Sequence, residues 1–496
     1  MSIMSSNTEI KLNFEKYRDS VYACWVGKNI GGTMGTPYEG KRQMQDISGF
    51  ITKPGAPLPN DDLDLQLVWL HAMERMGPNA ITAAMLGEFW VSFIAPNWSE
   101  YGIGKNNMRL GLVPPLAGDY HNDWKNSNGA WIRTEVWACM APGCPDIAAS
   151  YALEDASVDH GSGEGTIAAA FVAAMQSAAF VVKDIHKCIE IGLAEIPAES
   201  RMADSVRLAL KCYADKVPVR DARNIIQQRN ADIGDGWFEA PSNVAYAVLG
   251  LLYGEGDFKK SMIYAINCGD DTDCTGATVG ATLGILGGSA IVPTEWKDYI
   301  GDDIITISIV TGDWPTTGHF PKTCTELSER IAAQAPVVLF TKHAYVSFTE
   351  GEDVIPEDPA GFILSRCKLA EVTSRLKPYT MHFDFPILSA DLTLSDTPDI
   401  NPGDERTVTV TLYLNRHLGD ILHNLTMRWI LPDGFTLVSG KKSVILPTET
   451  PHYDHIATFD YVIRAGDDIA PLNRCVLEMT AVGRPTAMYM PVLFVG

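Results

Sequence analysis

The chain has 496 residues, of which 46% are hydrophobic and 20% charged, a balance typical of a globular protein with room for several domains. Its formal net charge of −22 argues against nucleic acid or an anionic membrane as the main partner. The N-terminal stretch MSIMSSNTEIKLNFEKY lacks the basic and apolar regions of a signal peptide, and the ten cysteines show no CxxC spacing. We therefore expect a cytoplasmic protein with reduced thiols.

Helical periodicity dominates the first two thirds of the chain. Stretches such as ADSVRLALKCYADK and GTIAAAFVAAMQSAAFVV repeat apolar residues at helical spacing, and loops rich in Gly, Pro and Asn separate them. The pattern predicts an all-α domain over residues 13–345. A connecting segment over 346–384 follows, and it contains the polar stretch EGEDVIPEDPAG.

The spacing of apolar residues changes near residue 385. Before it, they recur every three to four residues, and after it they recur every second residue. The stretch ERTVTVTLYL places Val408, Val410, Leu412 and Leu414 on one face and mostly threonines on the other. Similar strands with turn signals between them predict a small immunoglobulin-like β-sandwich over residues 385–496. The fold is therefore predicted to be mainly α, with a sandwich behind it that serves packing or assembly, including homo-oligomer formation.

Two clusters of aspartates lie at predicted helix starts. In PNDDLDLQLVWLHAMER, Asn60 is a favourable N-cap, and Asp61, Asp62 and Asp64 fill the first turn. Acidic residues are favoured there by the helix dipole alone, by about 0.3–1 kcal/mol each, so one cluster is weak evidence for a site.

The second cluster opens the stretch NCGDDTDCTGATVGATLG. Its carboxylates are Asp270, Asp271 and Asp273, and Thr272, Asp273 or Thr275 is expected to cap the helix that follows. Glycines then recur every fourth residue at 276, 280 and 284, which gives the helix a smooth face. We expect this face to let Asp271 and Asp273 approach Asp61 and Asp62, with Gly280 at the tightest point.

Bringing the two helix starts together would place four or more carboxylates in one small volume. Like charges about 4 Å apart repel by several kcal/mol at intermediate dielectric, and a divalent cation relieves this repulsion. An all-oxygen ligand set is typical of hard cations. The sequence therefore predicts a site for one or two hard divalent cations, Mg²⁺, Mn²⁺ or Ca²⁺.

Five motifs in the same order resemble the ADP-ribosylglycohydrolase family. They are CWVGKNIGGTMGTPYEG, NDD, SNGAWIR, DASVDHGSGEG and GDDTDCTGATVGATLG, and the resemblance covers residues 15–335 or so. It implies an all-α fold with a di-magnesium centre in a cleft. It also implies cleavage of the bond between the anomeric carbon of ADP-ribose and a protein side chain or small acceptor.

The resemblance implies roles for residues of each motif. Glu39, Asp62 and Asp271 are implied as catalytic, with Glu39 a mobile acid that accepts the proton of water or stabilises an oxocarbenium-like transition state. The implied metal ligands are Asn60, Asp61, Asp62, Asp271, Asp273 and Cys274, with Asp64 and Asp270 as weaker candidates. The implied substrate-binding residues are Ser127, Asn128, Gly129, Ala130, Arg133 and His160.

Several positions depart from the family pattern. Cys274 replaces a threonine that usually binds metal, and because a thiol is a poor Mg²⁺ ligand, we expect that position to pass to water, Thr275 or Thr272. Asn60 also replaces a threonine, but its amide oxygen can still bind metal. The remaining departures are Leu63 for threonine, Gly32 for aspartate and Ser127 for glycine.

Three functions remain open at this point. The first is a metal-dependent hydrolase acting on ADP-ribosylated protein or on an ADP-ribosyl small molecule. The second is another ribosyl, furanosyl or nucleoside hydrolase with the same metal centre, which the altered phosphate loop favours. The third is a non-catalytic binding or structural protein, which the four retained aspartates at 61, 62, 271 and 273 argue against.

Overall fold

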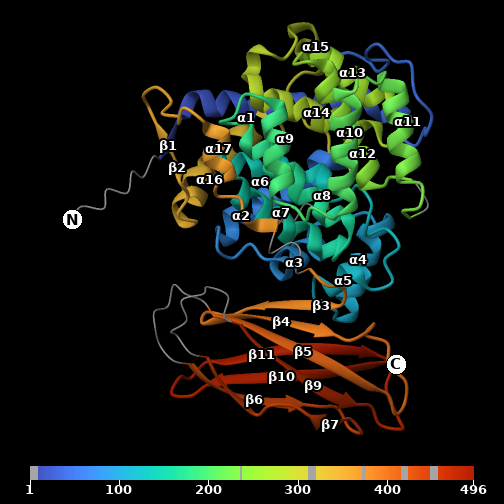
Figure 1. Ribbon diagram of the computed structural model, residues 1–496, viewed down its shortest axis with the longest axis vertical. Coiled ribbons are helices and arrows are strands. Elements are labelled where there is room, and N and C mark those ends of the chain that lie inside the picture. The colour runs from blue at the N-terminus through green and yellow to red at the C-terminus, as the bar shows by residue number, and fades with distance from the viewer. Residues whose placement is uncertain (1–8, 235–236, 311–319, 371–375, 415–422, 447–455) are drawn as a thin grey trace. The chain divides into compact units, whose positions relative to one another are not determined.

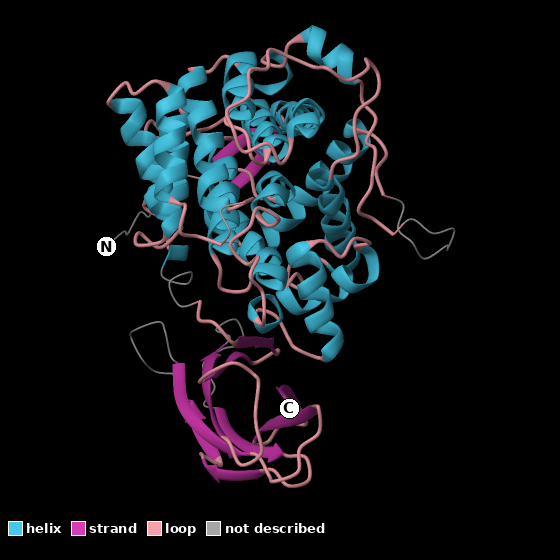
Figure 2. Ribbon diagram, turned by 90° about the vertical axis from the view of Figure 1, so that its right-hand side faces the viewer, coloured by secondary structure: helices cyan, strands magenta, loops and turns pink. Residues whose placement is uncertain are grey.

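The computed structural model describes residues 9–234, 237–310, 320–370, 376–414, 423–446 and 456–496. The chain forms two compact units, one from Met1–Tyr101 with Asp123–Arg375 and the other from Gly102–Asn122 with Leu376–Gly496. The first unit is helical, and the second is built mainly of strands (Figures 1 and 2). The predicted mainly α fold followed by a β-sandwich is confirmed.

The first unit packs its helices around a buried core, and a short parallel strand pair, β1 (Ile10–Asn13) with β2 (Val346–Thr349), lies beside them. The helices are α1 (Phe14–Gly35), α2 (Asp61–Met76), α3 (Ala83–Phe93), α6 (Glu135–Met140), α7 (Pro145–His160), α8 (Glu164–Ala178), α9 (Ile185–Ala194), α10 (Arg201–Ala214), α11 (Val219–Arg229), α12 (Ala240–Gly254), α13 (Phe258–Asn267), α14 (Thr272–Gly287), α15 (Thr294–Ile300), α16 (Cys324–Thr341) and α17 (Pro359–Leu364).

Glycines bring α1 and α14 into backbone contact. A Cβ atom added at Gly280 would overlap the carbonyl oxygen of Gly27, and one at Gly31 would overlap the carbonyl oxygen of Gly276. The same overlap would arise at Gly35 against the first residues of α14. The smooth face of α14 therefore packs on α1, and this contact brings the end of α1 to the start of α14, where the aspartates lie.

Local capping fixes where α2 and α14 begin. The Asn60 side-chain oxygen accepts a hydrogen bond from the backbone N–H of Asp62 at 2.8 Å, which confirms the predicted N-cap. The N-cap of α14 is Asp271, one residue before the earliest position expected, and its side chain makes no capping bond. The Asp271 carboxylate thus stays available for contacts outside its own helix.

The second unit is an antiparallel sandwich of two sheets. One sheet has the order β11–β10–β6–β8 and the other β3–β4–β5–β9–β7. The strands are β3 (Thr380–Asp384), β4 (Leu388–Leu394), β5 (Glu405–Leu414), β6 (His423–Ile430), β7 (Thr436–Ser439), β8 (Ser443–Leu446), β9 (Ile456–Arg464), β10 (Leu472–Ala481) and β11 (Ala487–Val495).

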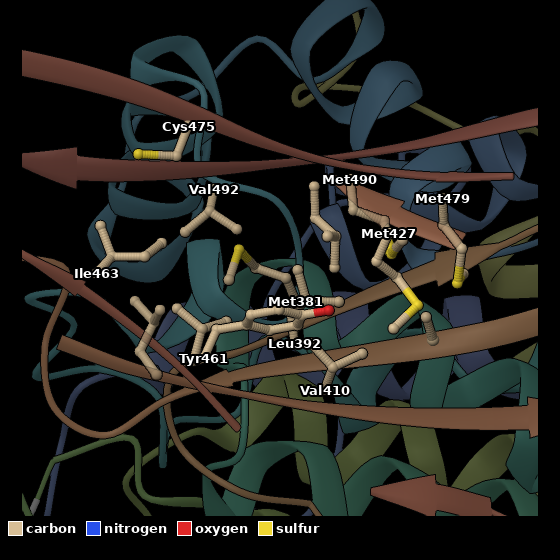
Figure 3. Close-up of a cluster of buried hydrophobic side chains, with 14 of the residues drawn as sticks. Met381, Leu392, Val410, Met427, Tyr461, Ile463, Cys475, Met479, Met490 and Val492 are labelled. Carbon is tan, nitrogen blue, oxygen red and sulfur yellow. The ribbon is translucent and has the colours of Figure 1, made fainter. Parts of the chain in front are cut away.

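The inward residues of the two sheets form one apolar core, with methionine, leucine and valine side chains meeting between the layers (Figure 3). On β5, Val408, Val410 and Leu412 are fully buried while the residues between them are partly exposed. The alternation predicted from ERTVTVTLYL is therefore the pattern that the strand adopts.

A segment from the first quarter of the chain, residues 102–122, completes this core. It contains most of α4 (Ser99–Leu110) and the short helix α5 (Leu116–Asp119), and Leu112, Leu116 and Tyr120 are buried among the sandwich residues. The Tyr120 hydroxyl donates a hydrogen bond to the Asp399 carboxylate at 2.7 Å. Residues 102–122 thus lie outside the first unit, although the sequence predicted one helical domain over 13–345.

Among the described residues, no single helix is both long and apolar enough to cross a bilayer. One pair of consecutive helical segments, Thr272–Ala290 and Thr294–Ile300, is long and apolar enough when taken together, but the chain bends by 115° between them.

Candidate metal centre

Carboxylates from three separate elements converge in the first unit. Glu39 follows the short 3₁₀ turn after α1, Asp61 and Asp62 open α2, and Asp271 and Asp273 open α14. Two triads are close enough to hold a cation, since one ligand atom from each member lies within 4.8 Å of the others. They are Glu39–Asp271–Asp273 and Asp62–Asp273–Cys274, so that Asp273 belongs to both.

Burial and mutual repulsion make these carboxylates hard to ionise. The charge of Asp273, with burial and Asp61 adding to it, raises the pKa of Glu39 to about 8. Burial, together with Asp273, raises the pKa of Asp61 to about 6. The pKa values of Asp62 and Asp271 are raised well above their ordinary range, mainly by burial.

Neighbouring side chains hold the aspartates in place. Asn128 donates to Asp271 at 2.6 Å and Tyr101 donates to Asp61 at 3.1 Å. The thiol of Cys274 donates to one oxygen of Asp62 at 3.3 Å. These bonds orient the carboxylates without neutralising them.

A buried lysine beneath the site balances part of its charge. The ammonium of Lys28 lies 3.1 Å from Glu135 and 3.9 Å from Asp62, and donates to the Ile132 carbonyl at 2.7 Å. Burial opposes its charge, but Glu135 and Asp62 raise the pKa of Lys28 above its ordinary value. Gln66 links Glu135 to the backbone carbonyl of Asp62. A buried polar network thus supports α2 at its acidic first turn.

The carboxylates open onto a cavity of about 210 Å³. Aromatic side chains share its walls with acidic ones, and the loop before the turn at Trp131–Arg133 contributes backbone and polar groups. The cavity is lined by Glu39, Asp61, Trp98, Ser99, Glu100, Tyr101, Trp124, Ser127, Asn128, Gly129, Ile132, Phe238, Asp271, Asp273 and Cys274.

Three residues of the sequence-derived set lie in this cavity wall from the SNGAWIR loop, namely Ser127, Asn128 and Gly129. The fully buried Ala130 is not among the lining residues. His160 is also fully buried, and its Nε2 atom lies 3.2 Å from the Ser127 hydroxyl, so it supports the loop from behind.

The placement of Arg133 corrects its expected role. Its side chain is fully buried, and its guanidinium donates to Asp155 at 3.0 Å, to Asp159 at 2.7 Å and to the Gly129 carbonyl. These partners occupy the donors that would otherwise bind a pyrophosphate. Arg133 therefore fixes the loop to α7 and does not face the cavity.

Arg133→Met should destabilise the fold by about 3–5 kcal/mol, because Asp155 and Asp159 would remain buried without their cation. Arg428→Met is the matched control. It breaks an exposed ion pair with Glu478 and should cost no more than about 1 kcal/mol. Thermal and denaturant unfolding measure both effects. If Arg133→Met is as stable as wild type but has a higher KM, Arg133 binds substrate and the structural role is wrong.

Three other expected ligands make different contacts. The side-chain oxygen of Asn60 caps α2, and its amide nitrogen occupies the space that a Cβ at Gly32 would take. Asp64 accepts from the backbone N–H of Ser308 at 2.6 Å, which anchors the loop there. Asp270, with a left-handed φ of 67°, accepts from Asn243 at 2.9 Å. Neither Asp64 nor Asp270 belongs to either triad.

Unpaired carboxylate oxygens in this site indicate that its side chains suit a divalent cation. One oxygen of Asp62 and one of Asp273 are buried without a hydrogen-bond partner. Unsatisfied buried carboxylate oxygens cost several kcal/mol unless a cation or donor meets them. Asp62, Asp271 and Asp273, with Glu39 from the exposed side, are therefore the residues that would hold the metal.

Metal-free protein should lose stability as the pH rises from about 5 to about 8. In the folded state the pKa values of Asp61 and Glu39 are about 6 and about 8, above their ordinary values. The folded state therefore binds more protons than the unfolded state across this range, and the free energy of unfolding decreases as the pH rises. Added Mg²⁺ should raise Tm more at pH 8 than at pH 5. Thermal unfolding with chelator or Mg²⁺ measures this, and a flat metal-free profile would contradict it.

Sequence reasoning missed Lys28, Tyr101 and the aromatic wall of Trp98, Trp124 and Phe238. The sequence does contain a signal for Lys28. It lies in a helix rich in glycine and apolar residues, which predicts that its side chain is buried, as the structure shows. The aromatic residues carry no local signal, because only the tertiary fold brings them to one cavity.

The fold and the site together define a mainly helical unit with an acidic cavity. The sequence model of the ADP-ribosylglycohydrolase family matches residues 13–325. The chain therefore belongs to the ADP-ribosylglycohydrolase family, a family of glycosidic hydrolases.

Known proteins resemble the chain over the same region. An uncharacterised protein of Archaeoglobus fulgidus is 23% identical over 301 residues, which is 58% of this chain and 92% of that protein. An ADP-ribosylglycohydrolase-related protein complex aligns with a TM-score of 0.40 and 19% identity, covering 66% of this chain and 99% of that chain. A FixG-related protein from Vibrio parahaemolyticus aligns over 22% of this chain and 97% of its own, with a TM-score of 0.18 and 8% identity.

Proposed function

We propose that the protein is a metal-dependent hydrolase that cleaves a ribosyl glycosidic bond. The observation that carries this proposal is the convergence of carboxylates from three elements at one cavity. Glu39, Asp61, Asp271 and Asp273 line it, and the buried Asp62 lies within ligand distance of Asp273. A glycosidic bond breaks through an oxocarbenium-like transition state, and a carboxylate-rich cavity stabilises its positive charge.

The chain's own groups supply orientation and proton transfer. Asn128 holds Asp271 in position, and the Ser127–Gly129 loop lines the wall where a substrate would lie. The Glu39 carboxylate is exposed and borders the cavity. A bound cation would lower its raised pKa, and the ionised carboxylate is then placed to accept a proton from an attacking water. A bound divalent cation would orient ribose hydroxyls and offset the carboxylate charge.

The first candidate substrate is an ADP-ribosyl group on a protein or small molecule, in line with the family. A second candidate, an uncharged ribosyl or furanosyl compound such as a nucleoside, is favoured by the lining of the cavity. Among the described residues that line it, five are acidic and none is Lys, Arg or His. Trp98, Tyr101, Trp124 and Phe238 offer flat surfaces for a base or sugar.

A substrate panel tests both candidates. Metal-free and Mg²⁺-loaded protein is incubated with ADP-ribosylated peptides, ADP-ribosyl small molecules, nucleosides and neutral furanosides, and the released sugar is identified by mass. Mg²⁺-dependent release of a ribosyl product is expected. Asp271→Asn should abolish release, whereas Asp270→Asn, in the same loop but outside both triads, should retain it. Absence of release from every substrate with metal present would overturn the proposal.

A further inference from the structure

The two cation-binding triads differ in chemistry. The triad of Glu39, Asp271 and Asp273 offers only oxygen atoms, and Glu39 is exposed. The triad of Asp62, Asp273 and Cys274 is buried throughout and offers a sulfur atom beside two carboxylates. A single hard cation species does not suit both ligand sets equally, because thiolate ligands favour softer cations such as zinc.

The thiol of Cys274 makes a contact that distinguishes it from several other cysteines of the chain. Cys188, Cys268 and Cys367 donate to backbone carbonyls of their own segments. Cys274 instead donates to the Asp62 carboxylate at 3.3 Å and lines the cavity. The sulfur is therefore directed at the acidic centre.

A second observation, independent of the cysteine, also indicates a cation at this position. The other oxygen of Asp62 and one oxygen of Asp273 are buried without hydrogen-bond partners, and both residues are at least 95% buried. The ammonium of Lys28 lies 3.9 Å from Asp62, outside hydrogen-bonding distance. Two carboxylates and one thiolate around a divalent cation would leave one negative charge beside the buried ion pair of Lys28 and Glu135.

We propose that the position formed by Asp62, Asp273 and Cys274 takes a thiophilic divalent cation of the zinc class. The all-oxygen position formed by Glu39, Asp271 and Asp273 takes a hard cation such as Mg²⁺. The centre then holds two unlike ions that share Asp273. On binding, the Cys274 S–H bond breaks, the proton leaves to solvent, and the sulfur lone pair binds the cation, which stays divalent. The proposal rests on the metal dependence proposed above.

Cobalt substitution tests the proposal without any enzymatic assay. Metal-free protein is titrated with Co²⁺, which shows sulfur-to-metal charge-transfer absorption only when a thiolate binds it. Wild type is expected to show this absorption, Zn²⁺ to displace it, and excess Mg²⁺ to leave it in place. Cys274→Ser should lose the absorption and bind Zn²⁺ about 10²-fold more weakly, while its Mg²⁺ binding remains.

Cys188→Ser is the matched control, because Cys188 is also buried and donates a similar bond at 3.2 Å to a carbonyl far from the triad in sequence. It should retain the absorption. X-ray absorption of Zn²⁺-loaded wild type, which depends on no variant, should show a sulfur neighbour at about 2.3 Å. Absence of that neighbour, or charge-transfer absorption that persists in Cys274→Ser, would overturn the mixed centre. Failure of the substrate panel would instead overturn the hydrolase assignment and leave this readout unaffected.

Discussion

Asp273→Asn should remove metal from both positions of the centre and abolish hydrolysis. Asp273 is the residue common to the two triads, so the loss of its charge weakens both cations at once. Activity should fall by more than the roughly 10–100-fold that removal of a residue orienting a metal ligand costs. Metal content after dialysis and turnover on the identified substrate measure the effect.

Asp270→Asn provides the control in the same loop. Asp270 bonds Asn243 and the backbone of Phe238, and asparagine tolerates its left-handed φ of 67°. The exchange removes one carboxylate charge three residues from Asp273 without removing a member of either triad. Equal loss of metal in the two variants would show that total charge, and not the shared position, determines binding.

Gly280→Ala should weaken both the fold and the metal centre. Alanine is favoured over glycine in a helix by about 1 kcal/mol, but here its Cβ would overlap the backbone of Gly27, and overpacking typically costs about 1–3 kcal/mol. The helices α1 and α14 would have to separate, which moves Glu39 relative to Asp273. Displacements of about 1 Å can reduce turnover by 10²-fold.

Gly49→Ala is the matching control, since a Cβ there meets nothing within 4 Å. Denaturant unfolding and Mg²⁺ titration of both variants measure the difference. Metal affinity of Gly280→Ala equal to that of wild type would show that the contact between α1 and α14 serves stability alone.

Local patterns predicted the elements but not their partners. The Asn60 cap, the acidic first turn of α2 and the alternation of β5 depend on neighbours in sequence, and the structure has all three. The smooth face of α14 predicted a close approach, yet its partner is α1 and not α2. A helix face shows how near a neighbour can come but not which neighbour does.

The role of Arg133 could not be predicted from neighbouring residues either, because it depends on partners that are distant in sequence. Its carboxylate partners, Asp155 and Asp159, lie more than twenty residues ahead on α7, and one helical turn separates them. A motif places an arginine near a site, whereas burial decides whether it faces substrate or structure. The sequence alone does not report that burial.

The excursion of residues 102–122 into the second unit has a consequence for how the protein can be divided. Trp98 and Tyr101 precede the excursion and Trp124 follows it, and all three line the cavity. Removing residues 376–496 would expose the apolar side chains of Leu112 and Leu116 to solvent. The segment that carries them is connected along the chain to cavity residues at both of its ends. The core of the second unit is therefore built from two separate parts of the chain, and a fragment that ends before residue 376 would lack the strands that bury Leu112 and Leu116.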